Sequence, residues 1–284
     1  MGMSQQQFQK LFEPARLGRM ELRNRLVMPP MATNYGSEEG FVTQRMIDYY
    51  QERARGGVGL IIVEFTCVDS PLGRATPRQL LIDDDRFIPG LARLAEAIKQ
   101  HGAKAALQVH HVGRQARSSV TGHQPVAPSP IPAPGGELPR ELSVAEIETI
   151  VTRFAQGAER AMRAGFDGVE IHAAHGYLIS QFLSPLSNRR RDAYGGDVEN
   201  RARLLLEVIE AIRRRVGKDY PLWCRLSALE FGVEGGITLE ETQVVARLAE
   251  RVGADAIHVS GHALRPGRRS PMAQAVGAML PLAE

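Results

Sequence analysis

Apolar and polar residues alternate along the chain in two different patterns. Six short segments are apolar at nearly every position and rich in β-branched residues: Arg25–Met28, Gly59–Phe65, Ala103–Val109, Gly168–Ala173, Leu222–Ser227 and Ala256–Ser260. Such segments are typical of parallel strands that are buried on both faces. Between them, five longer segments carry apolar residues at helical spacing: Gln44–Arg55, Phe87–His101, Val144–Ala164, Glu199–Val216 and Leu239–Val252. The pattern therefore predicts an α/β protein in which strands and helices alternate.

Residues at the helix ends support this assignment. Ser143 with Glu146, and Thr238 with Glu241, have the spacing of a capping box at a helix start. Glycines follow four of the helical segments: Gly102, Gly165, Gly217 and Gly253. Because glycine accepts the left-handed conformation that commonly ends a helix, these positions predict the C-termini.

Strand–helix units that all run in one direction fit either an open doubly wound sheet or a barrel. An open nucleotide-binding sheet should have a glycine-rich loop after its first strand, whereas this chain has Pro29-Pro30-Met31-Ala32 there. We therefore predict a TIM (β/α)8-type barrel with only about six of the eight units present. Leu280–Glu284 resembles a helix start that is not continued, so we expect a chain cut short by two units. No linker divides residues 1–284, which predicts one domain, and Pro125–Gly136 predicts a long surface loop.

Composition and charge exclude several classes of protein. The 284 residues are 43% hydrophobic with a net charge of +3, which is ordinary for a globular chain. No apolar run approaches the roughly 20 residues that a membrane crossing needs, and two cysteines are too few for a disulfide framework. We expect a cytoplasmic protein that binds neither membranes nor nucleic acid. The two arginine clusters are interpreted as solvated loops; they are Arg189–Arg191, and Arg265 with Arg268 and Arg269.

Polar residues that follow the predicted strands mark the candidate site, because a barrel carries its chemistry at the C-terminal ends of its strands. His172, His175 and Tyr177 fall within six residues after one strand. Two imidazole N–H groups can stabilise an oxygen on which negative charge develops, and a phenol can deliver a proton. Zinc needs three or four ligands, and this segment offers no carboxylate or cysteine. We therefore predict no metal site, although a distant ligand leaves a metal-dependent barrel enzyme as an alternative.

Gln108 and Arg225 also follow apolar runs, at the ends of the third and fifth predicted strands. An amide and a fixed positive charge suit a ligand with a carbonyl–imide edge that becomes anionic, but a buried pair that satisfies backbone groups fits the spacing equally well. His110, His111 and His262 are ambiguous between packing and function. Cys67 is interpreted as an inert packing residue, because nothing near it in sequence would lower its pKa.

Several motifs resemble the Old Yellow Enzyme family of FMN-dependent ene-reductases, in particular its branch of 2,4-dienoyl-CoA reductases, enoate reductases and NADH:flavin oxidoreductases. The similarity spans nearly the whole chain and is most specific between residues 165 and 201. The matching segments are Leu11–Pro14, Arg23–Arg25, Val27–Met31, Leu107–His110, Gly113-Arg114, Gly165–His172, His175–Leu178, Phe182–Pro185, Asn188-Arg189, Asp192, Tyr194–Gly196 and Glu199–Arg201.

This resemblance implies an FMN across the barrel mouth and NAD(P)H as the hydride donor. Pro30, Met31, Ala32 and Thr33 would line the flavin, Gln108 would bind its pyrimidine edge, and Arg225 would face its N1–O2 side. His172 and His175 would bind the carbonyl oxygen of an α,β-unsaturated carbonyl or enoyl substrate. Tyr177 would protonate the α-carbon while hydride reaches the β-carbon.

The sequence also departs from the family pattern. Ala32 stands where many relatives have threonine or cysteine, and Phe65 where a small residue is common. The loops that hold the FMN phosphate in the family come after the seventh and eighth strands, beyond Glu284. An iron–sulfur cluster and FAD are expected only if a longer parent chain exists. The alternative is therefore a non-catalytic barrel fragment that binds FMN weakly or not at all, and the formation of a homo-oligomer is left open.

Overall fold

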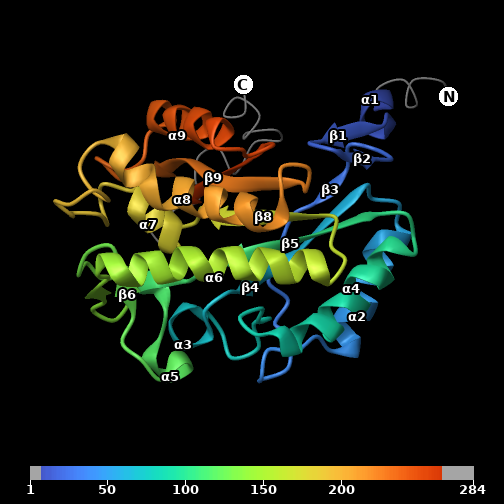
Figure 1. The fold of residues 1–284 in the computed structure, drawn as a ribbon, viewed down its shortest axis with the longest axis horizontal. Coiled ribbons are helices and arrows are strands. Elements are labelled where there is room, and N and C mark those ends of the chain that lie inside the picture. Colours follow the sequence, from blue (N-terminus) through green and yellow to red (C-terminus); the bar gives the residue numbers. More distant parts are fainter. Residues whose placement is uncertain (1–7, 264–284) are drawn as a thin grey trace.

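A curved sheet of six parallel strands forms the centre of the computed structural model, which describes residues 8–263 (Figure 1). The strand order is β10-β9-β8-β5-β4-β3, and every neighbouring pair is parallel. These strands are β3 (Val27–Met28), β4 (Leu60–Cys67), β5 (Lys104–His110), β8 (Gly168–Ala173), β9 (Leu222–Phe231) and β10 (Ile257–Ala263). The prediction of a barrel-type fold with about six units is thereby confirmed.

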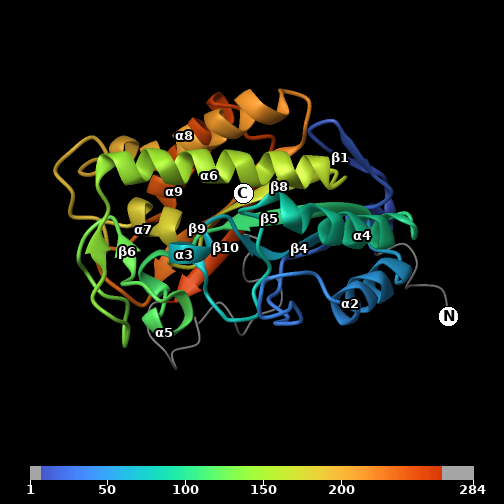
Figure 2. The ribbon, with the colours of Figure 1, turned by 60° about the horizontal axis from the view of Figure 1, so that its bottom comes forward.

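Five long helices cover the outer face of this sheet (Figure 2). They are α2 (Gln44–Arg55), α4 (Ile88–Lys99), α6 (Val144–Arg163), α8 (Val198–Val216) and α9 (Leu239–Arg251). Alternate strand residues, such as Ile61, Leu107 and Ile171, are fully buried in the layer between sheet and helices. Burial of one such side chain contributes about 1.5–3 kcal/mol, so this layer supplies most of the apolar stabilisation of the fold.

The predicted helix ends are largely confirmed. Ser143 and Glu146 form both bonds of the capping box on α6. Thr238 accepts a bond from the backbone of Glu241 (3.2 Å), but the carboxylate of Glu241 pairs with Arg201 instead of returning to the cap. The second box is therefore only half formed. All four glycines predicted at helix C-termini have a positive φ.

The inner face of the sheet is apolar near the N-terminal ends of the strands. A hairpin of β1 (Ala15–Leu17) and β2 (Met20–Leu22) packs there. Its side chains form one buried cluster with the inner face, made of Met20, Leu22, Leu60, Ile62, Ala106 and Trp223. Beside this cluster lies an apolar cavity of about 300 Å³, which Trp223 and His258 help to line. We call the opposite, C-terminal end of the inner face the mouth.

Short elements occupy the connections between the long ones. Those after β4 and β5 lie around the mouth. The short elements are α1 (Gln9–Phe12), α3 (Ser70–Gly73), η1 (Asp85–Phe87), η2 (Gly113–Gln115), α5 (Ser118–Thr121), β6 (Val126–Ala127), β7 (Arg140–Glu141) and α7 (Leu178–Leu183).

Three sequence interpretations need correction. The strand predicted over Leu222–Ser227 continues to Phe231, so Arg225 lies inside β9 and not at its end. The loop predicted over Pro125–Gly136 is buried over its first residues, because β6 pairs with β7. Arg190 is only 8% exposed. It pairs with Asp192 (2.5 Å) and donates to the carbonyl of Leu142 (2.6 Å), so it anchors two loops and is not solvated.

Some predictions fall on residues outside the described part of the chain. These are the helix start at Leu280–Glu284 and the arginine cluster at Arg265, Arg268 and Arg269. The single domain over residues 1–284 stays a prediction. Among residues 8–263, no helix is both long and apolar enough to cross a membrane.

Candidate active site

Polar side chains gather on the inner face above the hairpin, because strand side chains alternate between the two faces of a sheet. Inward positions of four neighbouring strands are polar at this level. Their residues come from β5, β8, β9 and β10 and bond to one another or to the loop after β8: Gln108, Glu170, His172, Ser227, His258 and Ser260. The sheet register thus builds a polar mouth on an apolar base.

His172 and His175 face one another in the mouth. The Nε2 atom of His172 lies 3.3 Å from the Nδ1 atom of His175, and the Nε2 atom of His175 lies 2.6 Å from the Ser260 hydroxyl. The Nδ1 atom of His172 accepts a bond from the backbone N–H of Ala174 (3.3 Å), which places the His172 proton on Nε2. The two rings therefore form a hydrogen-bonded chain that ends at Ser260.

The His172 ring is neutral near pH 7. Burial, together with the neighbouring imidazoles of His110 and His175 and the guanidinium of Arg225, lowers its pKa well below the usual range. A neutral imidazole carries one N–H, so His172 can donate one hydrogen bond to a ligand but brings no full charge to it.

Tyr177 lies against the histidines in an aromatic cluster. Its ring centroid is 4.4 Å from that of His110, 4.9 Å from that of His172 and 6.1 Å from that of Phe65. Burial raises the pKa of the Tyr177 phenol. The phenol therefore keeps its proton at neutral pH and gives it up only to a strong base, such as a carbanion formed beside it.

Two glutamines fix the backbone between these side chains. Gln115 donates to the carbonyls of His175 (3.0 Å) and Gly176 (2.8 Å), and Gln181 donates to that of Gly176 (2.7 Å). His175 has a φ of 59°, a left-handed conformation that is uncommon for a residue with a side chain. The carbonyl bonds hold the loop in this conformation, which aims the His175 ring at Ser260.

Gln108 and Arg225 lie on the same inner face, although both lie inside their strands. The amide of Gln108 donates to Glu170 (2.7 Å). Burial lowers the pKa of Arg225, an effect that Glu170 opposes, and a guanidinium remains charged under such shifts. The Arg225 Nε is buried without a hydrogen-bond partner among the described residues. A cationic donor with an unmatched Nε thus lies on the same inner face as a fixed amide, with strand β8 between them.

The segment predicted to line a flavin is attached to the mouth through Glu64. Pro30 is buried, Met31 and Ala32 are exposed and Thr33 is half-buried. The backbone N–H of Thr33 donates to the Glu64 carboxylate (2.9 Å), and the Tyr50 hydroxyl lies 3.3 Å from the same oxygen. This anchor holds the segment beside strand β4.

The other histidines and the cysteine considered in the sequence lie outside the group of polar residues at the mouth, except for His110. His111 is fully buried and lies 3.5 Å from Asp69, as expected of a loop anchor. His262 lies within β10 opposite Glu230. Burial raises the pKa of the Cys67 thiol well above its usual range, which agrees with an inert role. His110 differs from these, because it is fully buried and neither ring nitrogen has a hydrogen-bond partner among the described residues.

Sequence reasoning missed Glu170, Ser227, Ser260, Gln115 and Gln181 as members of the site. A usable signal existed for three of them. Glu170 is two residues before His172, Ser227 is two residues after Arg225, and Ser260 ends a predicted strand. Counting by two from the chosen residues would have placed them on the same face.

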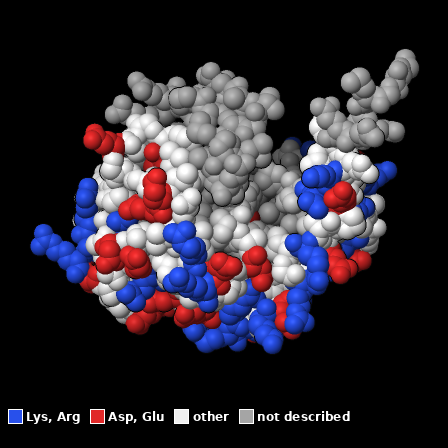
Figure 3. All heavy atoms as spheres, turned by 90° about the horizontal axis from the view of Figure 1, so that it is seen from above, with Lys and Arg blue, Asp and Glu red and all other residues white. Residues whose placement is uncertain are grey.

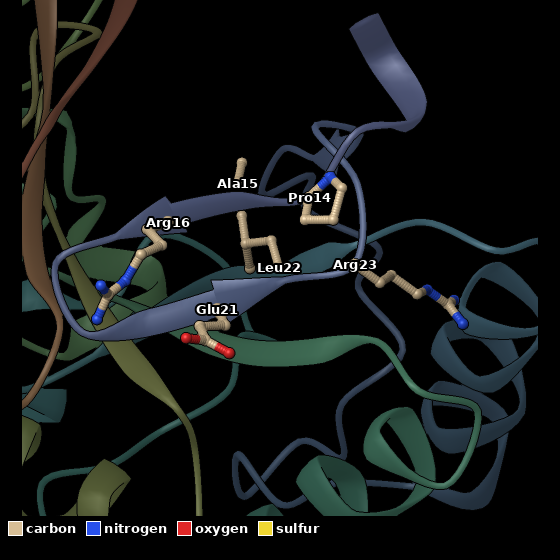
Figure 4. Close-up of a pocket in the computed structure, with 6 residues that line it drawn as sticks. All are labelled: Pro14, Ala15, Arg16, Glu21, Leu22 and Arg23. Carbon is tan, nitrogen blue, oxygen red and sulfur yellow. The ribbon is translucent and has the colours of Figure 1, made fainter. Parts of the chain in front are cut away.

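Two other kinds of site were considered among the described residues: a metal centre and a second pocket, at the hairpin. Within residues 8–263, histidine, cysteine, aspartate and glutamate side chains form no group of three that could hold a metal ion. An open pocket of about 650 Å³ lies at β1 and β2, lined by Pro14–Arg16 and Glu21–Arg23 (Figure 4). Its Arg23 side chain is engaged by the carbonyls of His101 (2.8 Å) and Val58 (3.0 Å), so this arginine serves the fold.

Charged side chains of both signs are mixed over the face seen in Figure 3. Among the described residues of this face, acidic and basic side chains lie next to one another, and the blue ones form no continuous stripe. The described part of this face therefore lacks the basic stripe of a nucleic-acid interface, and the absence of such a partner stays a prediction.

The curved sheet of six parallel strands, with polar residues at its mouth, is part of a TIM-type barrel. Residues 10–276 match the NADH:flavin oxidoreductase / NADH oxidase family, and the chain belongs to this family. The resemblance to Old Yellow Enzymes is thereby confirmed, and membership of this family indicates FMN as the cofactor.

Relatives of known sequence and structure agree with this assignment. The chain is 53% identical over 255 residues to an NADH oxidase of Thermoanaerobacter brockii, covering 89% of this chain but 39% of that protein. It is 44% identical to an NADPH dehydrogenase of Geobacillus sp., covering 91% of this chain and 74% of that protein. The chain therefore spans less than two fifths of the first relative and about three quarters of the second.

Solved structures show the same fold. A 2-naphthoyl-CoA reductase in complex with 2-naphthoyl-CoA superposes with a TM-score of 0.92 at 32% identity, over 97% of this chain and 44% of that chain. The Old Yellow Enzyme homologue of Zymomonas mobilis superposes with a TM-score of 0.83 at 32% identity, over 92% of this chain and 76% of that one.

Proposed function

We propose that this chain carries the active site of an FMN-dependent oxidoreductase that reduces the activated carbon–carbon double bond of an α,β-unsaturated carbonyl or enoyl compound with NAD(P)H. One observation carries the proposal. Two imidazoles and a phenol with a raised pKa meet on the inner face that also holds Gln108 and the unmatched Arg225. Donors for an oxygen, an acid and a site for a flavin edge thus share one mouth.

Gln108, Arg225 and the segment Pro30–Thr33 would hold the flavin ring. When bound, the cofactor would supply what no side chain can, namely hydride exchange between NAD(P)H and the substrate β-carbon. The guanidinium of Arg225 would stabilise negative charge at the carbonyl edge that it faces.

His172, His175 and Tyr177 would act on the substrate. The Nε2–H of His172 would donate to the carbonyl oxygen in place of its bond to His175, and His175 would turn from Ser260 to donate to the same oxygen. These two bonds would stabilise the negative charge that develops on the oxygen as hydride arrives. Tyr177 would then transfer its phenolic proton to the α-carbon.

Two other assignments remain as alternatives. The strands β3 and β10 have no further strand partner within the described residues, which fits a fragment that binds FMN weakly or not at all. A metal-dependent barrel enzyme has no supporting ligand cluster between residues 8 and 263. A single domain over residues 1–284, a homo-oligomer and a cytoplasmic location also remain proposals.

An absorption spectrum of the purified chain tests the cofactor part. The chain is mixed with excess FMN, desalted and scanned in the visible range. We expect a retained flavin band whose shape differs from that of free FMN, and we expect the arginine variant Arg225→Ala to retain less. A colourless wild-type chain would contradict the proposal for this chain and favour the fragment. Zinc in a colourless chain would favour the metal enzyme.

A further inference from the structure

Glu170 is the most completely enclosed carboxylate of the mouth. It has 0% exposure and accepts three short contacts, from Gln108 Nε2 (2.7 Å), Trp223 Nε1 (2.6 Å) and His258 Nδ1 (2.7 Å). A buried charge persists only where such partners compensate its loss of water. No step of the proposed reaction uses this carboxylate, so its place in the mouth needs another explanation.

We propose that Glu170 is a positioning residue that turns the carboxamide of Gln108, so that its oxygen and not its NH2 group faces the mouth. This inference rests on the proposed function, because it states which kind of ligand group Gln108 binds. The Gln108 oxygen would then accept a hydrogen bond from a ligand N–H, such as that of the imide nitrogen of a flavin ring.

The orientation follows from the chemistry of the two groups. A carboxamide has a donor end and an acceptor end, whereas a carboxylate only accepts. The end of Gln108 that faces Glu170 must therefore be the NH2 group. Trp223 and His258 both engage the Oε2 atom of Glu170, which leaves Oε1 for Gln108.

The frame around this pair is rigid. Gln108 and Glu170 are register partners on β5 and β8, and Glu170 and Trp223 are register partners on β8 and β9. Trp223 is also packed in the apolar cluster with the hairpin and is 2% exposed. Because backbone pairing and packing fix all three residues, the Gln108 oxygen has a fixed direction before any ligand arrives.

Gln108 and Arg225 then present complementary groups to one ligand edge. The Gln108 oxygen accepts, while the guanidinium of Arg225 only donates. An acceptor and a cationic donor on the same inner face, one strand apart, match a ligand edge that carries both an N–H and a carbonyl. If a neutral side chain replaced Glu170, the Gln108 amide could rotate by 180°. Its NH2 group would then face the mouth and could no longer accept a hydrogen bond from the ligand N–H.

Exchanging the two side chains tests the proposal directly. We would measure the Kd for FMN by flavin fluorescence in the wild type, Glu170→Gln, Gln108→Glu and the double variant. Each single variant should bind FMN about tenfold or more weakly, since one hydrogen bond is lost or reversed. The double variant should recover most of the affinity, because it restores the pair with its two roles exchanged. The amide introduced on β8 donates to the carboxylate introduced on β5, and that carboxylate still presents an oxygen to the mouth.

A matched control uses Glu230, another buried glutamate, which accepts from Ser184 (2.7 Å) and from the backbone of Ile237 (3.0 Å). Glu230→Gln should leave the FMN affinity within about twofold of the wild type. If Glu170→Gln also binds FMN like the wild type, or if the double variant is as weak as the single ones, the positioning role is wrong.

A second readout needs no flavin. Trp223 is the only tryptophan of the chain, so a nitrogen–proton NMR spectrum contains one indole signal, and the Gln108 amide is the signal missing from Gln108→Glu. Both signals should shift in Glu170→Gln. If the wild type binds no FMN, the proposed function fails for this chain while these shifts still decide the orientation. An unchanged Gln108 signal would overturn it.

Discussion

The Nε2 atom of His175 and the hydroxyl of Ser260 lie 2.6 Å apart, although 85 residues separate them in sequence. The contact joins the loop after β8 to strand β10. The backbone of His175 adopts the left-handed conformation there, with a φ of 59°. One edge strand of the sheet thus takes part directly in the arrangement of the candidate catalytic residues.

Replacement of Ser260 by alanine should loosen this arrangement. The variant removes the hydroxyl that His175 contacts, so the free energy of unfolding should fall by about 1 kcal/mol, the usual net value of one hydrogen bond. Urea denaturation of the purified chain measures the loss. Ser119→Ala, at an exposed position, serves as the control and should change stability by less than about 0.5 kcal/mol. Equal stability of the two variants would contradict the contact.

Tyr177→Phe should separate the two halves of the proposed reaction. Reduction of bound FMN by NAD(P)H should stay within about twofold of the wild type, because it needs no acid. Reoxidation by an enone should slow by about 10²-fold or more, the usual contribution of a general acid. Stopped-flow absorbance measures each half separately. Equal slowing of both would count against Tyr177 as the acid.

His172→Ala should weaken the binding of a phenol to the oxidised, FMN-loaded protein. A phenolate resembles the enolate that the two histidines are proposed to stabilise, and each lost charge-assisted bond costs about tenfold in affinity. Titration of the flavin absorbance with a simple phenol measures the effect. His123→Ala is the matched control, since His123 is exposed. An unchanged titration in His172→Ala would remove that residue from the ligand site.

The pH dependence of stability should depend on His110. Burial, with the neighbouring imidazoles of His111 and His175, lowers the pKa of His110 well below its usual range. An unfolded chain therefore takes up this proton first as the pH falls. The stability that neutral His110 contributes is complete above about pH 6.5 and is lost as the pH falls below that value.

His110→Leu should accordingly flatten the pH profile. Below about pH 6.5, the slope of the unfolding free energy should fall by up to about 1.4 kcal/mol per pH unit, the value for one proton. Urea denaturation between about pH 7.5 and 5 measures this slope. His123→Leu, at an exposed position, is measured in parallel as the control for the substitution itself. A slope that His110→Leu leaves unchanged would show that the ring is not kept neutral in the fold.

Much of the fold could be predicted from the sequence, because apolar strand patterns and amphipathic helix patterns alternate regularly along the chain. The apolar runs at 59–65, 103–109 and 168–173 lie in strands β4, β5 and β8, and all five helical segments are present. The missed extent of β9 has a physical cause. Residues beyond Ser227 include Glu230, which does not look apolar but is buried through its bonds to Ser184 and Ile237.

The site was predictable only in part. His172, Tyr177, Gln108 and Arg225 stood out because they are polar residues within or just after apolar strands. Ser260 did not, because its hydroxyl contacts His175, which is distant in sequence and is brought near only by the fold. Pairing among distant side chains depends on sheet register and on loop conformation, and neither is written in a local pattern.

The hairpin of β1 and β2 has a consequence for the order in which the chain assembles. Met20 and Leu22 are buried against residues of β4, β5 and β9. A ribosome makes the hairpin before any of these strands, so the surface that its apolar side chains cover is incomplete until Trp223 has been synthesised. Contacts between such distant segments form late, because closing a long loop costs entropy. The hairpin is therefore translated early, but the apolar surface on which it packs is complete only after β9 has been synthesised.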